Sequence, residues 1–279
     1  MRKKIHPIFV ALFFLLFTGL ILVTRGLGQE QTEQATSATS DSSSTSEPSY
    51  HASSVHITNA LEMKPIIDVS GWQRPSDIDY DTLSSHISGA IIRVQSGSHT
   101  KKDNNASDES GLDKHYKTHI KEFQERGIPV AVYAYVTGNS IESMKKEAKS
   151  FYEASSKYKP TYYWLDVEEK TMDDMNAGVE AFRQELADLG AKNIGIYVGT
   201  YFMAEHNISV DKFTALWIPT YGTNSGYYNA APATDLDYDL HQYTSVGSLS
   251  GFAHHLDLNL ITTLKEPNEV YQKLFTSPE

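Results

Sequence analysis

Residues 162–170 read YYWLDVEEK, an aromatic and apolar run that leads directly into three carboxylates. The run predicts a buried strand, in which successive side chains point to opposite faces. One face is then apolar, while the other carries Trp164, Asp166 and Glu168. Ionised carboxylates are costly to bury unless they are paired, hydrogen-bonded or kept neutral. The stretch is therefore either a strand that runs out into a solvated loop or part of an active site.

Seven further segments from Pro65 onward are also candidate strands. Together with 161–168 they are 65–70, 89–95, 128–137, 193–199, 215–221, 238–244 and 255–261. In strand after strand, one face is aliphatic and the other is acidic, aromatic or amide, and Asp68 and Asp257 lie on such polar faces. A solvated loop explains one strand of this kind but not several with the same polarity, so the active-site interpretation is favoured.

Helical periodicities lie between several of these strands. Apolar residues recur at helical spacing over 112–123, 141–158 and 172–189. Eight strands interleaved with helices over some 200 residues predict an α/β fold, a TIM-like (β/α) barrel. The helical pattern weakens between the later strands, so we expect an irregular barrel. A doubly wound open sheet is the alternative.

The carboxylates are candidates for acid–base chemistry. Asp166 and Glu168 lie at the C-terminal end of a strand, where barrel enzymes hold their catalytic residues, with Cα atoms about 6.5 Å apart. Asp68 and Asp257 are expected to converge there. Neighbouring, partly desolvated carboxylates do not all ionise easily, so at least one should have a raised pKa. A protonated carboxylic acid beside an ionised one is what glycoside hydrolysis requires.

Aromatic side chains accompany the acids on the same faces. The apolar faces of sugar rings stack on such side chains, and the candidates for substrate binding are Tyr133, Tyr135, Tyr197, Trp217 and Tyr221. The alternative to acid–base chemistry is that the carboxylates bind a divalent metal ion. His254 and His255 would point to opposite faces of a strand, and no H-E-x-x-H or H-x-H spacing occurs. The chain also has no Walker loop and no G-x-G-x-x-G motif, which argues against nucleotide handling.

The N-terminal part of the chain has a different composition. Basic residues precede an apolar run over 7–24, which is long enough to cross a bilayer. Because no good cleavage site follows, residues 1–28 are interpreted as a cytoplasmic stub and an uncleaved anchor, with a cleaved signal peptide as the alternative. Residues 29–60 are rich in Ser, Thr, Gln and Glu and predict a disordered linker. The folded domain is then 61–279, outside the cytoplasm in either case.

The composition of this domain excludes some kinds of site and some classes of partner. The 279 residues include no cysteine, which excludes thiolate metal sites and disulfides. Beyond residue 28, 20 basic residues face 35 acidic ones, a net charge of −15. Such a domain has no electrostatic footprint for nucleic acid. We expect a monomer that binds no nucleic acid and reaches a membrane only through its N-terminal segment.

Several motifs occur in an order that resembles a known family. They are IDVSGWQ at 67–73, YYWLDVEE at 162–169, IYVGTYF at 196–202, LWIPTYG at 216–222, LHQYTSVGSLSG at 240–251 and DLN at 257–259. Together they resemble the family 25 glycoside hydrolases, lysozymes of the Chalaropsis type that cut bacterial peptidoglycan between N-acetylmuramic acid and N-acetylglucosamine.

The resemblance implies roles for particular residues. Glu168 would be the general acid, and Asp68, Asp166 and Asp257 would complete an acidic cluster in a site without a metal or other cofactor. Gln242, within one of the motifs, joins the expected substrate-binding set. The resemblance also implies that the configuration is retained, with the substrate's own acetamido group as nucleophile. A peptidoglycan-binding module without turnover and a metal-dependent barrel hydrolase remain the alternatives.

Overall fold

The computed structural model describes residues 54–97 and 104–276. The predicted anchor or signal (1–28) and the linker up to residue 53 lie outside them. Helix α2 (Ser54–Glu62) overlaps the last part of the predicted linker, and its residue Ala60 is fully buried, so that part of the linker prediction is wrong. In the described ranges no helix is both long and apolar enough to cross a bilayer.

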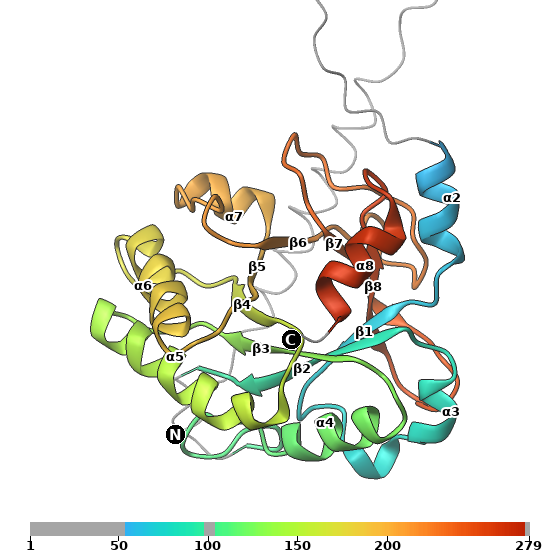
Figure 1. The fold of residues 1–279 in the computed structure, drawn as a ribbon, viewed down its shortest axis with the longest axis horizontal. Helices are drawn as coiled ribbons and strands as arrows, with labels where there is room; N and C mark the ends of the chain where they lie inside the picture. Colours follow the sequence, from blue (N-terminus) through green and yellow to red (C-terminus); the bar gives the residue numbers. More distant parts are fainter. Residues whose placement is uncertain (1–53, 98–103, 277–279) are drawn as a thin grey trace, which may run out of the picture. The chain divides into compact units, whose positions relative to one another are not determined.

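Eight strands close into a barrel in chain order (Figure 1). They are β1 (Ile66–Val69), β2 (Gly89–Gln95), β3 (Val130–Tyr135), β4 (Tyr163–Val167), β5 (Ile194–Val198), β6 (Ala215–Pro219), β7 (Leu240–Gly247) and β8 (Leu256–Ile261). Each predicted strand is present. The closed order confirms the barrel and excludes the open sheet.

The barrel is irregular in its last quarter, as the weak helical pattern there predicts. The helices after α2 are α3 (Tyr80–Ser84), α4 (Tyr116–Glu125), α5 (Ile141–Ser155), α6 (Met175–Asp188), α7 (Thr200–Glu205) and α8 (Pro267–Phe275), with 3₁₀ turns η1 (Pro75–Asp77) and η2 (Ser156–Tyr158). Strands β1 to β7 run parallel to one another, but β8 is antiparallel to both β7 and β1. Because residues 248–255 are too few for a helical crossover, the chain turns back as a hairpin instead.

Strand alternation separates two apolar clusters. The outward-facing aliphatic residues, among them Ile67, Ile92 and Leu165, pack beneath the helices. The inward-facing residues include Trp164, which is 1% exposed and fills the barrel. A Cβ at Gly195 would lie 2.3 Å from the Trp164 ring, so the missing side chain of this glycine makes room for the indole. The middle of the barrel is therefore packed with side chains.

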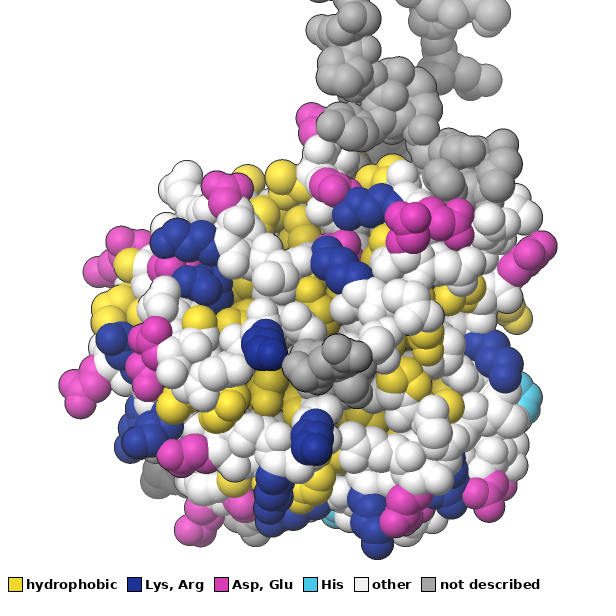
Figure 2. Space-filling view, in the orientation of Figure 1, with side chains coloured by type: hydrophobic (Ala, Val, Ile, Leu, Met, Phe, Trp, Pro, Cys, Tyr) yellow, Lys and Arg dark blue, Asp and Glu magenta, His cyan; other side chains and the backbone are white. Residues whose placement is uncertain are grey.

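Helix α8 closes the N-terminal end of the barrel. Val270, Leu274 and Phe275 join the inward-facing cluster, and the Tyr271 hydroxyl donates to the Ser88 carbonyl at 2.6 Å. Phe275 packs where a side chain at Gly89 would otherwise project. On the face drawn in Figure 2, basic and acidic side chains are interspersed. With this end plugged, a ligand reaches the barrel interior from the C-terminal ends of the strands.

Candidate active site

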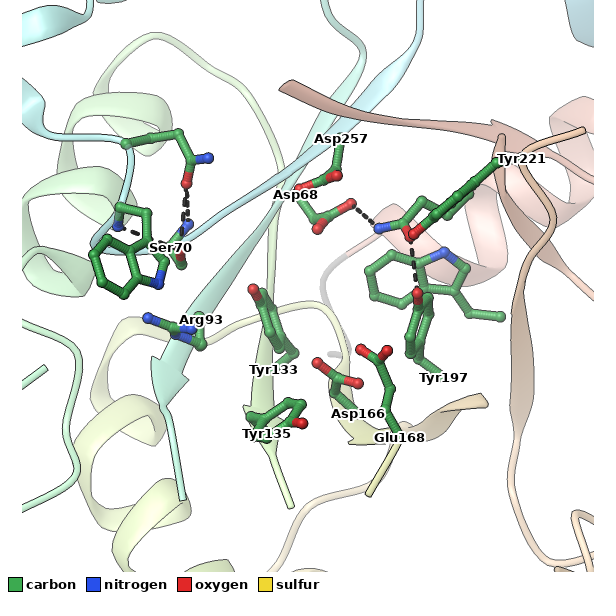
Figure 3. Close-up of a pocket in the computed structure, with 14 residues that line it drawn as sticks. Asp68, Ser70, Arg93, Tyr133, Tyr135, Asp166, Glu168, Tyr197, Tyr221 and Asp257 are labelled. Atoms are coloured by element: carbon green, nitrogen blue, oxygen red, sulfur yellow. Dashed lines mark hydrogen bonds between the residues drawn. The ribbon is translucent and has the colours of Figure 1, made fainter. Parts of the chain in front are cut away.

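A pocket of about 310 Å³ opens at the C-terminal ends of the strands (Figure 3). All ten residues predicted for the site line it: Asp68, Tyr133, Tyr135, Asp166, Glu168, Tyr197, Trp217, Tyr221, Gln242 and Asp257. They come from seven strands or the residues directly after them, which explains why no single stretch of sequence carries the whole site.

Strand register places the acids at one level. Asp166 on β4 pairs with Tyr135 on β3 and with Tyr197 on β5. Asp68 near the end of β1 pairs with Asp257, the second residue of β8. Because β8 is antiparallel, the start of this strand lies beside the end of β1. The hairpin therefore brings Asp257 to the same rim as the other carboxylates.

Asp68 is buried and held by two amides. Its Oδ2 atom accepts a hydrogen bond from Gln242 Nε2 at 2.9 Å and another from Asn259 Nδ2 at 2.8 Å. Burial raises the pKa of Asp68 to about 6, and Glu168 also raises it, while the two amide donors oppose the shift. The amides stabilise the ionised form, so Asp68 is set to titrate near neutral pH.

The two amides tie Asp68 to the aromatic wall of the pocket. Gln242 Oε1 accepts hydrogen bonds from the hydroxyls of Tyr197, at 2.8 Å, and Tyr221, at 2.5 Å. Asn259 Oδ1 accepts from the indole nitrogen of Trp217 at 2.8 Å. Three predicted sugar-binding aromatics are thus fixed through one carboxylate, which makes this side of the pocket rigid before any ligand arrives.

Asp166 and Glu168 share one face of β4 but differ in exposure. Asp166 is 8% exposed, and its Oδ1 atom has no hydrogen-bond partner among the described residues. Burial and the neighbouring Glu168 carboxylate hold the pKa of Asp166 well above its usual range. Glu168 is exposed at the pocket mouth, and its carboxyl group lies beside that of Asp166 in Figure 3. The prediction that crowding raises at least one carboxyl pKa is confirmed.

Asp257 adds a third perturbed carboxyl group. Burial first, and then the charges of Asp68 and Glu168, raise the pKa of Asp257 to about 8. At neutral pH the pocket therefore holds at least one carboxylic acid that keeps its proton, Asp257, beside the ionised Asp68. That combination supports proton transfer to a leaving oxygen together with stabilisation of positive charge.

Four further residues that line the pocket were not predicted from the sequence. Ser70, Trp72, Gln73 and Arg93 also face the pocket. The signals were present, because Arg93 alternates with Ile92 and Val94 along β2, and Trp72 lies within the first motif. Trp72 is 59% exposed, unlike Trp164, which lies below the pocket in the packed interior.

The histidine pair lies outside the pocket. His254 and His255 are exposed in the segment between β7 and β8. Within the described ranges, no three His, Cys, Asp or Glu side chains are arranged to hold a metal ion.

Comparison with known proteins identifies the family. The profile described as glycosyl hydrolases family 25 matches residues 67–252. The comparison with curated proteins finds no significant match. Among solved structures, the chain is 58% identical to the virulence factor GHIP, a glycosyl hydrolase 25 of Streptococcus pneumoniae participating in host cell invasion, with a TM-score of 0.76 over 80% of this chain and 97% of that one.

Two more distant structures share the fold. The catalytic domain of endolysin ply40, from bacteriophage P40 of Listeria monocytogenes, is 25% identical, with a TM-score of 0.62 over 75% of this chain and 97% of that one. The bacterial lysozyme of Streptomyces coelicolor is 16% identical, with a TM-score of 0.57 over 78% of this chain and 99% of that one. The profile match and the 58% identity to GHIP show that the chain belongs to the glycosyl hydrolases of family 25.

Proposed function

We propose that this enzyme is a lysozyme that cleaves the β-1,4 bond between N-acetylmuramic acid and N-acetylglucosamine, with Glu168 as the general acid. Membership of a family of glycoside hydrolases supports hydrolysis of a glycosidic bond in peptidoglycan. One observation carries the assignment of residues. Four carboxyl groups, three of them with raised pKa values, converge at one aromatic-lined pocket.

The four carboxyl groups differ in their exposure to solvent, and this difference suggests which of them acts as the general acid. Glu168 is the exposed one, at the mouth of the pocket, where an incoming glycosidic oxygen arrives first. It donates a proton to that oxygen as the bond to C1 of the muramyl sugar breaks. The acetamido oxygen of the same sugar attacks C1, and Asp166, beside Glu168, helps to place the acetamido group for that attack. Water then adds at C1 with Glu168 as base, which retains the configuration.

Asp68 and Asp257 act around this step. Asp68, ionised above about pH 6, supplies negative charge to an oxocarbenium-like transition state. Asp257, directly across the β1–β8 ladder, keeps its proton to about pH 8 and is a hydrogen-bond donor for a sugar hydroxyl. Tyr197, Trp217 and Tyr221 form the wall on which a sugar ring packs.

Glu168→Gln tests the assignment. Loss of general acid catalysis typically lowers the rate about 10²- to 10⁴-fold, so release of dye from labelled peptidoglycan should fall by that factor while glycan binding persists. The control is Glu153→Gln, the same change at an exposed glutamate that pairs with Lys149 on the surface of α5. Equal activity of the two variants would refute the role of Glu168.

The same assay judges the two alternatives. A binding module without turnover would release no dye even as the unaltered protein. A metal-dependent hydrolase would lose activity in EDTA and regain it with Mg²⁺ or Zn²⁺. The family match favours neither of them.

The location of the enzyme is also proposed. A cell-wall hydrolase acts outside the cytoplasm, and the apolar run over 7–24 supports attachment to the outer face of the cell membrane through an uncleaved segment. The catalytic domain would then be carried by the linker as a monomer. Sedimentation of the extracted protein as a dimer would contradict that last point.

A further inference from the structure

Arg93 is the only Lys or Arg among the described residues that line the catalytic pocket. It lies on β2, and its cross-strand partner on β3 is Tyr133. The mechanism proposed above makes no use of a positive charge at this place. The role of this arginine, in a pocket with four carboxyl groups, is therefore not explained by that mechanism.

Most of the donors of Arg93 have no acceptor. Its Nε atom donates to Asp113 Oδ2 at 3.2 Å, which is the one ion pair of this side chain in the described structure. Among the described residues, Nη2 has no hydrogen-bond partner and is shielded from solvent, and the one hydrogen bond that Arg93 donates comes from Nε. A guanidinium carries five N–H donors, and leaving charged donors unpaired at a buried position is costly. The side chain is only 13% exposed, so solvent does not satisfy it fully.

Asp113 holds the guanidinium in place. It is 2% exposed and accepts backbone hydrogen bonds from Gly71 at 2.5 Å and His115 at 2.9 Å, in addition to the one from Arg93. These two backbone donors fix the carboxylate independently of Arg93. The guanidinium is thus oriented by a rigid acceptor on its Nε side, and its terminal nitrogens are left for another partner.

The position of Arg93 relates it to the reacting sugar. In Figure 3, Tyr133 lies between Arg93 and the carboxyl groups of Asp166 and Glu168. Burial raises the pKa of the Tyr133 hydroxyl, the charge of Arg93 opposes this rise, and the charges of Asp68 and Asp166 add to it. Arg93 and the acids line the same pocket, so a substituent directed past Tyr133 from a sugar bound over the acids would face Arg93.

One substituent distinguishes the two sugars of the substrate. N-acetylmuramic acid carries a 3-O-lactyl group, whereas N-acetylglucosamine has a free hydroxyl at that position. The lactyl carboxyl is an anion when free and an amide carbonyl when a peptide is attached, and it presents acceptor oxygens in both forms. Planar guanidinium donors match a carboxylate in geometry as well as in charge.

We propose that Arg93 donates hydrogen bonds from its terminal nitrogens to the carboxyl oxygens of the lactyl group, and so selects the muramyl sugar for the reactive position. This inference rests on the proposed function and adds the residue that recognises one sugar of the pair. Arg93 is then a specificity determinant, and a glycan built only of N-acetylglucosamine gains nothing from it.

The test compares two ligands that differ in the lactyl group. In the Glu168→Gln protein, calorimetry measures the affinity for a tetrasaccharide of alternating N-acetylglucosamine and N-acetylmuramic acid, and for chitotetraose. The test variant adds Arg93→Gln together with Asp113→Asn, so that no buried carboxylate is left without its cation. Arg183→Gln is the control, because Arg183 is 12% exposed and paired with Glu180 but lies on α6 outside the pocket.

The expected result is a loss of selectivity. The protein with Arg93→Gln and Asp113→Asn should bind the muramyl ligand about 10- to 100-fold more weakly than the Glu168→Gln parent does, which is the effect of losing hydrogen bonds to a charged group. Its affinity for chitotetraose should be unchanged. Arg93→Lys, which keeps the charge without the planar fork, should lie between the two. The Arg183→Gln control should bind both ligands as the parent does.

Three results would overturn the proposal. They are equal weakening for both ligands, which marks a general effect on the charge or shape of the pocket, no weakening for either, and a parent protein that does not prefer the muramyl ligand. Cleavage of the ligand by the Glu168→Gln protein is a separate outcome. It would refute the role of Glu168 but leave the ratio of the two affinities as the measure of Arg93.

Discussion

Gln242→Met should move the acidic limb of the pH–activity profile to higher pH. Gln242 donates a hydrogen bond from Nε2 to Asp68 at 2.9 Å, and this bond stabilises the ionised form of the carboxylate. Methionine has similar length and no donor. The substitution therefore removes one of the two side-chain amides that hold the pKa of Asp68 down to about 6.

The size of the shift follows from the strength of that bond. A hydrogen bond to a charged group contributes about 1.5–3 kcal/mol, and one pKa unit corresponds to about 1.4 kcal/mol. The pKa of Asp68 should thus rise by about one to two units. Because Asp68 is proposed to act ionised, activity would be lost at pH values where the unaltered enzyme still works. The position of the acidic limb reflects the titration of the coupled carboxyl groups together and not of Asp68 alone.

The assay is dye release from labelled peptidoglycan between pH 4 and pH 9, at substrate concentrations that report kcat/KM. Tyr221→Phe is the control, because it removes one hydroxyl from Gln242 but leaves Tyr197 to hold that amide and leaves the bond to Asp68. Its acidic limb should stay at the position of the unaltered enzyme, whatever its rate. A Gln242→Met protein that melts normally and keeps that limb in place would refute the link between Gln242 and Asp68.

Two further predictions concern stability and location. The pKa of Asp257 is about 8 in the folded protein and near the ordinary value of 3.8 in the unfolded chain, so its contribution to stability is present below pH 3.8 and is lost as the pH rises to 8. Asp257→Asn should therefore raise the Tm relative to the unaltered protein at pH 9 but not at pH 3.5, and an equal Tm difference at both would contradict this. For the anchor, N-terminal sequencing of the membrane-extracted protein should find residues 1–28 retained, and a mature form that begins near Gln29 would rule it out.

Much of the site was predictable because strand alternation is a local property. Asp166 shares a face with Trp164 and Glu168 in any straight strand, so the inward orientation of the acid follows from spacing alone. Eight alternating segments then sufficed to predict a barrel and its open end. The linker boundary failed for a different reason. Residues 54–62 have a weakly apolar composition, and α2 folds against α8 and β8, which lie about 200 residues away.

The amino-acid sequence by itself determined which residues face inward and that acids and aromatics gather at the strand ends, because the two-residue period acts within each strand. Only the tertiary structure decided how these residues act on one another. The antiparallel β8 places Asp257 opposite Asp68, and Gln242 and Asn259 reach Asp68 across sequence separations of 174 and 191 residues. Arg93 likewise meets Asp113, which lies 20 residues further along the chain. Burial then raises the pKa values of Asp68, Asp166 and Asp257, since desolvation depends on everything packed around a carboxyl group and not on its neighbours in the chain.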